Sequence, residues 1–312
     1  MSNYTQNQYV KDENNSWSIV FELVKDKQTV LDIGCSSGNF GAELINRKAC
    51  IVDGIDMDEK DVKLAQKKLR NAYVQNVESD NLDHLIGKYD AVLMMDVIEH
   101  LVTPVPTLKK IATLLKPGGS LIFSVPNMAH ISVRLDLLLG DLDYRNTGLL
   151  DDTHLHFYSE KTLLKVLKNA GYTVDTAKSS TVSYPKQLVN LKLEEAGLKA
   201  SPKFEKMIEK TKGNVYQLIG TAQPSSNTIK SISFPDKNPH EEHYLQIERA
   251  MNDQSRHLRN LEGEIQARDQ HIKNVEERLQ HIVNTRTYKL AHVPLKSLRK
   301  AKTVIKPKKK KG

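Results

Sequence analysis

A short stretch at residues 29–40 constrains the fold of this chain more than any other part of the sequence. Residues 29–33 are mostly apolar and β-branched, which predicts a buried strand. Gly34 and Gly38 follow, and glycine lets a backbone bend tightly or approach a ligand closely. Apolar side chains then recur at helical spacing, so a helix is predicted to begin at Asn39. A strand, a glycine-rich turn and a helix predict the nucleotide-binding corner of a doubly wound α/β sheet.

The alternation of strands and helices continues through the first 223 residues. The two glycines do not have the spacing of the dinucleotide fingerprint, and no P-loop Lys-Ser/Thr pair follows Gly38. Short connections predict a mostly parallel sheet with both faces covered, and strands near 172–178 and 214–222 would complete seven strands. The other strands are predicted at 29–33, 51–55, 73–76, 89–95 and 119–125, and helices at 17–24, 39–47, 59–70, 104–115 and 160–170, with a helical insertion at 185–212.

Charge is distributed unevenly along the chain. The net charge of +8 arises after residue 223, where 19 Lys and Arg outnumber 10 Asp and Glu, against 27 and 28 in the rest. The two cysteines, Cys35 and Cys50, give neither a disulfide framework nor a zinc cluster. The polar start has no signal-peptide core, and no apolar run reaches the ~18 residues that span a bilayer. We therefore expect a cytoplasmic protein with a polar lead-in at 1–14, a near-neutral globular domain at 15–223 and a basic appendage.

The basic appendage has three predicted parts. Residues 224–239 are rich in Ser, Asn, Pro and Lys and predict a linker. In residues 240–285, apolar side chains fill most a and d positions of nearly six heptads, which predicts a coiled coil; a single amphipathic helix folded back on the domain is the alternative. Residues 286–312 hold 11 basic and no acidic side chains. They predict attachment to the anionic inner face of a membrane. One alternative is a solvated tail that binds nothing. Another is binding to nucleic acid, a polyanion that is less favoured here.

Several ordered motifs in the globular domain resemble a known family. The run Asp-x-Gly-Cys-x-x-Gly at 32–38 resembles the cofactor motif of class I S-adenosylmethionine (SAM)-dependent methyltransferases. The runs at 89–101, 114–119 and 123–127 resemble the ubiquinone O-methyltransferase-like group of that family. The run Gly-Leu-Leu-Asp-Asp-Thr-His-Leu-His-Phe-Tyr at 148–158 resembles a subgroup found with bacterial surface-glycan enzymes. The resemblance implies a Rossmann-like fold that uses SAM.

The resemblance places the SAM site at the carboxyl ends of the strands. Asp32 would meet the cofactor's ammonium group, directly or through water. Asp56 ends the second strand, 24 residues after Asp32, and offers two oxygens to the ribose hydroxyls; its alternative role is the N-cap of the next helix. Met57 would lie against the adenine, and the stretch 75–78 would receive the adenine amino group unless it is a plain polar loop. The predicted SAM contacts are Asp32, Gly34, Cys35, Gly38, Asn39, Phe40, Asp56, Met57, Asn76, Val77, Glu78 and Asp96.

A group of acids and histidines follows the fourth predicted strand. Helical spacing would bring Asp96 and His100 to one side with Glu99 adjacent, and His154 would approach from a later loop. These four residues are predicted ligands of a divalent metal, and they resemble the ligands of metal-assisted RNA 2′-O-methyltransferases and metal-dependent quinone O-methyltransferases. The alternative is that they shape an acceptor pocket without a metal. Asp96, His100 and His154 are also the predicted catalytic residues, because a histidine of near-neutral pKa can serve as a base. Further candidate bases are His130 and His156.

These observations predict a SAM-dependent O-methyltransferase that acts on a saccharide or lipid-linked surface glycan. Its coiled coil would join copies of the chain or a glycan-synthesis partner, and its basic tail would hold it at the membrane. The sequence leaves three alternatives open: a quinone or small-phenol O-methyltransferase, an RNA 2′-O-methyltransferase, and a scaffold that keeps a SAM fold without catalysis.

Overall fold

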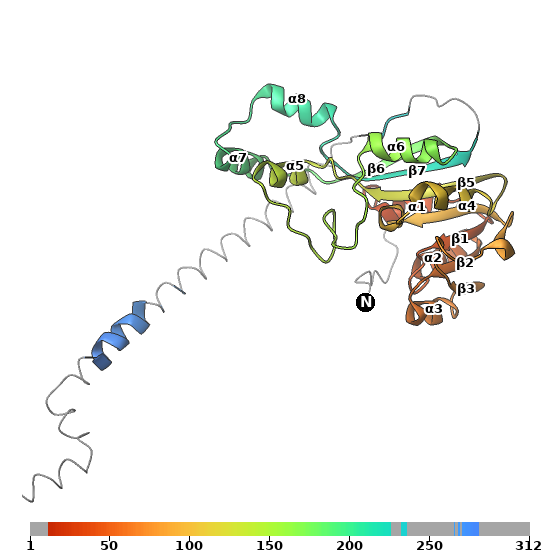
Figure 1. The fold of residues 1–312 in the computed structure, drawn as a ribbon, viewed down its shortest axis with the longest axis horizontal. Coiled ribbons are helices and arrows are strands. Elements are labelled where there is room, and N and C mark those ends of the chain that lie inside the picture. Colours follow the sequence, from red (N-terminus) through yellow and green to blue (C-terminus); the bar gives the residue numbers. More distant parts are fainter. Residues whose placement is uncertain (1–11, 226–231, 236–264, 266–267, 269, 281–312) are drawn as a thin grey trace, which may run out of the picture. The chain divides into compact units, whose positions relative to one another are not determined.

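The computed structural model describes residues 12–225, 232–235, 265, 268 and 270–280 (Figure 1). The chain divides into two compact units, Met1–Tyr244 and Leu245–Gly312. In the second unit residues 270–280 are helical, and three of the predicted heptad positions in them, Ile272, Val275 and Leu279, are exposed. The rest of the predicted coiled coil and the basic tail lie outside the described residues, so both stay predictions.

A seven-stranded sheet forms the centre of the first unit and confirms the predicted fold class. The strand order is β3-β2-β1-β4-β5-β7-β6, with β7 antiparallel to both of its neighbours. The chain runs outwards from β1 to β3 and then returns to place β4 beside β1. This reversal puts a topological switch point where the carboxyl ends of β1 and β4 meet. The strands are β1 Thr29–Ile33, β2 Ile51–Asp56, β3 Asn71–Val74, β4 Tyr89–Met95, β5 Leu115–Pro126, β6 Tyr172–Thr181 and β7 Val215–Pro224.

Helices cover both faces of the sheet, because successive strand residues point to opposite sides. Val30 belongs to an apolar cluster with residues of α1, α2 and α3, whereas the adjacent Leu31 belongs to a second cluster with residues of α4 and α6. Each face of the sheet therefore has its own core. The helices of these two layers are α1 Ser16–Leu23, α2 Asn39–Lys48, α3 Glu59–Ala65, α4 Pro104–Ala112 and α6 Glu160–Asn169.

The third helix ends, and the third strand begins, earlier than the periodicity predicts. α3 ends at Ala65 rather than at 70, and β3 begins at Asn71 rather than at 73. The physical reason is Asp53, buried on β2, whose carboxylate accepts hydrogen bonds from Arg70 Nε at 2.8 Å and Asn71 Nδ2 at 3.0 Å. These bonds draw the chain out of the helix and lay it beside β2.

A smaller helical layer packs around its own apolar cluster. It consists of α5 (Ile131–Leu138), α7 (Lys186–Glu195) and α8 (Pro202–Lys210), which Figure 1 shows grouped near one end of the sheet. The sequence predicts helical structure for the last two, within the insertion at 185–212, but not for α5. Two single 3₁₀ turns complete the fold, η1 at Asp83–Leu85 and η2 at Ile98–His100.

Part of the predicted linker packs on the first unit. Phe234 is fully buried, and its ring centroid lies 6.4 Å from that of Phe123 on β5. The Ser179 hydroxyl of β6 donates a hydrogen bond to the carbonyl oxygen of Pro235. Residues 232–235 are therefore anchored to the sheet. Among the described helices, none is both long and apolar enough to cross a membrane.

Candidate active site

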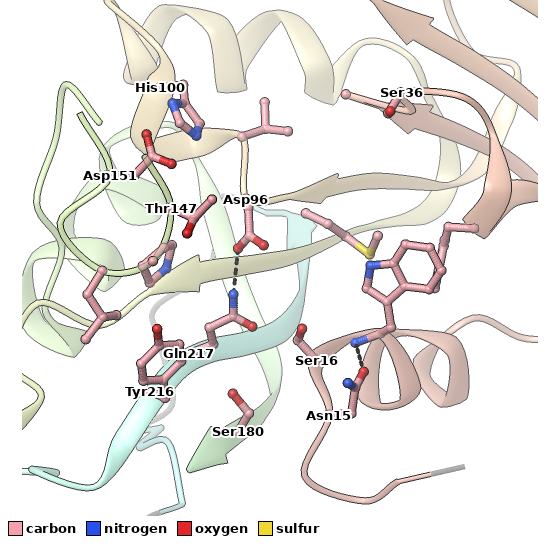
Figure 2. Close-up of a pocket in the computed structure, with 18 of the residues that line it drawn as sticks. Asn15, Ser16, Ser36, Asp96, His100, Thr147, Asp151, Ser180, Tyr216 and Gln217 are labelled. Atoms are coloured by element: carbon pink, nitrogen blue, oxygen red, sulfur yellow. Dashed lines mark hydrogen bonds between the residues drawn. The ribbon is translucent and has the colours of Figure 1, made fainter. Parts of the chain in front are cut away.

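A cavity of about 810 Å³ opens at the switch point of the sheet. Most of its wall forms two halves, named here for the strands that carry them, and residues 12 and 14–17 line the rest. The β1–β2 half consists of Asp32, residues 34–40 without Gly38, and Asp56, Asp58 and Asp61. The β4–β7 half consists of residues 95–97, His100, Pro126, residues 147–149, 151, 153 and 154 of a later loop, residues 180–182 and residues 216–217. Figure 2 shows Ser36 on the first side and His100, Thr147, Asp151 and Tyr216 on the second.

The glycine-rich turn has the conformation that its sequence predicts. Gly34 and Gly38 have positive φ angles of 76° and 74°, which residues with a Cβ rarely adopt. A Cβ at Gly34 would also lie 2.8 Å from Val97 Cγ2. The N–H groups of Gly34 and Cys35 donate to the carbonyl oxygen of Ile55 at 2.8 and 3.1 Å, so the turn is fixed against the end of β2.

Two carboxyl groups line the cavity beside this turn. Asp56 Oδ2 accepts a hydrogen bond from the Ser36 N–H at 2.7 Å, while Asp58, not Asp56, caps α3. Asp32 is only 2% exposed. Burial, and secondly the charge of Asp56, raises the pKa of Asp32 to about 7. A cation bound beside Asp32 would offset the cost of its buried charge.

The cavity wall contains seven of the twelve predicted SAM contacts; the other five are Gly38, Met57, Asn76, Val77 and Glu78. The Met57 side chain is 70% exposed, and Val77 is buried in the core. The Glu78 carboxylate accepts hydrogen bonds from the N–H groups of Val102 and Thr103 at 3.0 and 2.7 Å, which holds the chain just before α4. In this structure Glu78 thus joins the end of β3 to the start of α4.

Asp96 occupies a strained position just after β4. Its φ of 53° lies in the left-handed region, and the single 3₁₀ turn η2 that follows is not the α-helix on which the predicted alignment of Asp96 with His100 rested. Asp96 Oδ1 instead accepts a hydrogen bond from Gln217 Nε2 at 2.9 Å (Figure 2) and another from Ser124 Oγ at 3.2 Å. Burial raises the pKa of Asp96 to about 6, against the opposing effect of these two bonds.

Three of the four predicted metal ligands come together. One ligand atom each from Glu99, His100 and His154 lies within 4.8 Å of the others. His100 Nδ1 donates to the carbonyl oxygen of Thr153 at 3.0 Å, and His154 Nδ1 donates to that of Leu149 at 3.2 Å. Because both Nδ1 atoms are used by backbone carbonyls, each Nε2 is left to accept a proton or bind a metal. We call Glu99, His100 and His154 the Glu-His-His cluster.

Glu99 is the buried member of this cluster. It is 1% exposed, and neither of its carboxylate oxygens has a hydrogen-bond partner in the part of the chain that the structure describes. Its Oε1 lies 4.0 Å from His154 Nε2. Burial, and secondly the charge of Asp96, raises the pKa of Glu99 well above its usual value, while burial and His100 lower the pKa of His154. The cluster therefore holds a neutral imidazole beside a carboxyl group that lacks a partner.

The two further candidate bases lie elsewhere. His130 is 1% exposed; its Nε2 donates to the carbonyl oxygen of Val182 at 2.7 Å, and its Nδ1 accepts from the Ser132 N–H at 3.3 Å at the start of α5. The His156 ring lies against Tyr158, with 6.0 Å between centroids, and does not line the cavity. Of the four candidate histidines, His100 and His154 are the two in the cavity wall.

Sequence reasoning missed several residues of the wall. Tyr216 and Gln217 come from β7, more than a hundred residues after β4, and no motif marks them. The predicted lead-in also contributes, because Asn14 lines the cavity and is bonded to the end of β6. Asn14 Oδ1 accepts from the Thr181 N–H at 2.7 Å, and Asn14 Nδ2 donates to the Thr181 carbonyl oxygen at 2.6 Å. The Asp-x-Thr-His run at 151–154 is a sequence signal that could have indicated Asp151, which also lines the wall.

A family model described as a methyltransferase domain matches residues 17–177. That span is more than half of the chain, and it contains the glycine-rich turn, Asp56 and the whole Glu-His-His cluster. The chain belongs to this methyltransferase family. The predicted membership of the class I SAM-dependent methyltransferases is thereby confirmed, and the order of the seven strands agrees with it.

Curated relatives of this methyltransferase domain are ubiquinone biosynthesis O-methyltransferases. The protein from Acinetobacter baumannii (strain ACICU) is 29% identical over 151 residues, which are 46% of this chain and 63% of that protein. The protein from Vibrio campbellii is 32% identical over 103 residues, 31% of this chain and 43% of that protein. The chain thus spans less than two thirds of the length of these relatives. A SAM-dependent methyltransferase from Methanosarcina mazei is 17% identical with a TM-score of 0.47, over 67% of this chain and 98% of that one.

The β1–β2 half has the donors and acceptors that SAM, the cofactor of this class, requires. SAM carries an ammonium, a sulfonium and a ribose diol. Asp32 is a buried carboxyl whose charge calls for a cation, and Asp56 stands at the carboxyl end of β2 with two oxygens as acceptors. Gly34 lets the Val97 side chain pack against the turn, where there is no room for a Cβ. The residues present therefore fit the cofactor.

Proposed function

We propose that this chain is a SAM-dependent O-methyltransferase whose acceptor is a hydroxyl group on a ring. One observation carries the proposal: a single cavity brings Asp32 and Asp56, beside the glycine-rich turn, opposite Asp96 and two histidines. The first side suits a cationic nucleotide-like cofactor. The second side holds groups that can orient a hydroxyl and take its proton.

The proposed work of the β1–β2 half is to bind and orient the cofactor. SAM, when bound, supplies an electrophilic methyl group. Asp32 pairs with the ammonium group, and Asp56 accepts hydrogen bonds from the ribose hydroxyls. Since little covalent help is needed for methyl transfer, holding the two reacting groups in line contributes much of the rate.

The proposed work of the β4–β7 half is to place and deprotonate the acceptor. Asp96 is held by Gln217 and Ser124, and it accepts a hydrogen bond from the acceptor hydroxyl. His154 is neutral because burial lowers its pKa, so its Nε2 takes the hydroxyl proton, with His100 as its neighbour. A base in such a position contributes roughly 10²–10⁴-fold.

We propose, as the alternative to His154 acting as the base, that the Glu-His-His cluster binds a divalent metal, because an Nε2 that holds a metal has no lone pair left for the hydroxyl proton. Two imidazoles oriented by backbone carbonyls and a buried carboxyl without a partner are the donor set that such an ion needs. The ion would supply Lewis-acid stabilisation of the acceptor oxygen. Asp96, whose Oδ1 is used by Gln217 and Ser124, is assigned to the acceptor rather than to the metal.

Two acceptor classes are supported by different observations. A phenolic ring is the first candidate, because the curated relatives are named for ubiquinone biosynthesis. A saccharide is the second candidate, and its support is the row of hydroxyl, amide and carboxylate groups in the β4–β7 half. That row consists of Asp96, Thr147, Asp151, Ser180, Tyr216 and Gln217.

The C-terminal features remain part of the proposal. The heptads at 240–285 support self-association or a glycan-synthesis partner, and the basic residues at 286–312 support attachment to an anionic membrane from the cytoplasmic side. Light scattering of the full chain and of a variant that ends at residue 239 tests the first: an unchanged oligomeric state would contradict it. Flotation with anionic vesicles, with and without 286–312, tests the second.

The enzyme proposal is tested by calorimetry and by transfer of labelled methyl. The full chain is titrated with SAM, and then incubated with labelled SAM plus catechol or a glycan-lipid fraction, with and without a chelator. We expect SAM binding and transfer to one acceptor. Loss of transfer with the chelator would assign His154 to a metal, and unchanged transfer would assign it to the base. Failure to bind SAM would overturn the proposal. Binding without transfer to any hydroxylated acceptor would favour the scaffold alternative.

A further inference from the structure

The charge of the cavity wall limits the charge that an acceptor can carry, and no sequence motif indicates this limit. We infer that the acceptor presents a polyhydroxylated ring without an anionic group to this cavity, with no phosphate or carboxylate near the reacting hydroxyl, and that Asp151 is a specificity-determining residue for this choice. The inference rests on the proposed function and narrows its substrate class.

The wall is acidic on both halves. Seven aspartates line it, whereas no lysine or arginine of the described residues does so: Asp12, Asp32, Asp56, Asp58, Asp61, Asp96 and Asp151. One of them, Asp32, is only 2% exposed, and its buried charge calls for a bound cation. The net single positive charge of SAM offsets a fraction of these formal charges. The cavity therefore stays negative when the cofactor is bound, and an anionic acceptor meets repulsion.

Asp151 brings this charge to the acceptor side. The Asp151 side chain lines the cavity and is only partly buried. Asp151 Oδ1 accepts from the Thr153 N–H at 2.9 Å, and Figure 2 shows the side chain beside His100 and Thr147. Asp151 thus places a full negative charge next to the groups proposed to receive the acceptor.

The other side chains of the acceptor side are neutral hydrogen-bonding groups. Thr147, Ser180 and Tyr216 offer hydroxyls, and Gln217 offers an amide whose Nε2 already bonds to Asp96. Hydroxyl groups of a ligand can both donate to carboxylates and accept from such hydroxyls, whereas phosphate and carboxylate oxygens accept only. A neutral polyol or catechol satisfies this wall, and a phosphate group does not.

Arg145 is the positively charged residue that would contradict this inference if it attracted an anionic acceptor. Its charge acts on Tyr216, so it stands near the acceptor side, but it does not line the cavity. A variant at Arg145 therefore belongs in the test, because an anion held by that guanidinium would contradict the assigned charge preference.

The test compares probes that differ in charge on similar rings. Catechol (neutral), protocatechuate (anionic) and dopamine (cationic) form one series, and methyl glucoside with glucose phosphate forms a second. Labelled methyl transfer is measured for each with the full chain, and binding to the S-adenosylhomocysteine-loaded chain is measured by calorimetry. The variants are Asp151→Asn, the neighbouring exposed Asp152→Asn as a matched control, and Arg145→Gln.

We expect the wild-type chain to favour a neutral probe over its anionic counterpart by about tenfold or more. Asp151→Asn should improve the anionic probe about fivefold relative to the neutral one, and Asp152→Asn should leave that ratio unchanged. Equal or better use of the cationic probe by the wild type would support the inference, whereas equal or better use of an anionic probe would overturn it. An unchanged ratio in Asp151→Asn, selective loss of the anionic probe in Arg145→Gln, or the binding of neither a neutral nor the cationic probe would also overturn it.

The two hypotheses fail in different ways. If SAM does not bind, the proposed function falls and the charge preference falls with it. If methyl is transferred efficiently to protocatechuate or glucose phosphate, the methyltransferase activity stands and the inferred acceptor class alone is wrong.

Discussion

The two halves of the cavity are built in opposite ways. The β1–β2 half comes from two neighbouring strands and the turn directly after the first, so its geometry is fixed by about thirty consecutive residues from Thr29 onward. The β4–β7 half joins the end of β4, the loop at 147–154 and β7, which are distant in the sequence. The proposed cofactor site is thus a local property of the chain, whereas the proposed acceptor site depends on the whole sheet.

The first way to test this contrast is to remove the proposed base. His154→Gln should lower kcat by roughly 10²–10⁴-fold, because a positioned base contributes that much, while SAM affinity in the other half of the cavity should stay unchanged. His156→Gln is the matched control, since His156 lies two residues away but outside the cavity. If His154→Gln keeps full kcat, another residue is the base.

The second experiment removes an acceptor group from the cofactor side. Asp56→Ala should weaken SAM binding by about 100-fold, because hydrogen bonds to a charged group contribute about 1.5–3 kcal/mol each. Calorimetric titration measures the effect, and Glu59→Ala in the first turn of α3 is the control. Equal affinities of Asp56→Ala and the wild type would remove Asp56 from the proposed ribose site.

The third experiment tests the long-range contact across the sheet. Gln217→Leu removes a donor to Asp96, so the pKa of Asp96 should rise above about 6 and the acidic limb of the pH–rate profile should move to higher pH. We expect kcat/KM at neutral pH to fall about tenfold. Gln223→Leu, farther along β7 at an exposed position, is the control. An unmoved pH profile would show that Gln217 does not tune Asp96.

The smallest expected effect is a pH dependence of cofactor binding. The pKa of Asp32 is raised to about 7 in the free protein, and the ionised carboxylate is the form that binds a cation. SAM affinity should therefore rise with pH up to about 7 and then level, with up to one proton released per SAM bound. Titrations in buffers of different ionisation enthalpy measure the proton release, and Asp32→Asn should abolish it.

The same group affects the stability of the free protein. The folded-state pKa of Asp32 lies above its unfolded value of 3.8, so the folded form binds the additional proton between these two values. The free energy of unfolding should fall as pH rises from about 4 to about 7, and SAM should reverse that loss. A thermal melt of the wild type that is flat across this range, relative to Asp32→Asn, would contradict the assignment.

How far the sequence predicts the site follows from this difference between local and long-range structure. The strand–turn–helix at 29–40, the acid at Asp56 and the seven-stranded sheet were all readable from periodicity and spacing, because each depends on neighbouring residues. The relative positions of Asp96 and His100 were not readable in this way, because a left-handed residue and a 3₁₀ turn replace the expected helix. Gln217 and Asn14 carried no sequence signal, because the pairing of β7 with β5 and the hydrogen bonds of Asn14 to Thr181 bring them to the cavity.

The sequence by itself determined that this chain winds a mostly parallel sheet and places a glycine-rich turn with two acids, Asp32 and Asp56, at one edge of it. Those features arise from short-range patterns of apolar residues and glycines. The tertiary structure decided which histidines share the cavity, that Glu99 is buried without a partner beside them, and that the acceptor side is acidic. The physical reason is that burial and the proximity of distant strands fix the charges and pKa values of these groups, and neither exists until the sheet has formed.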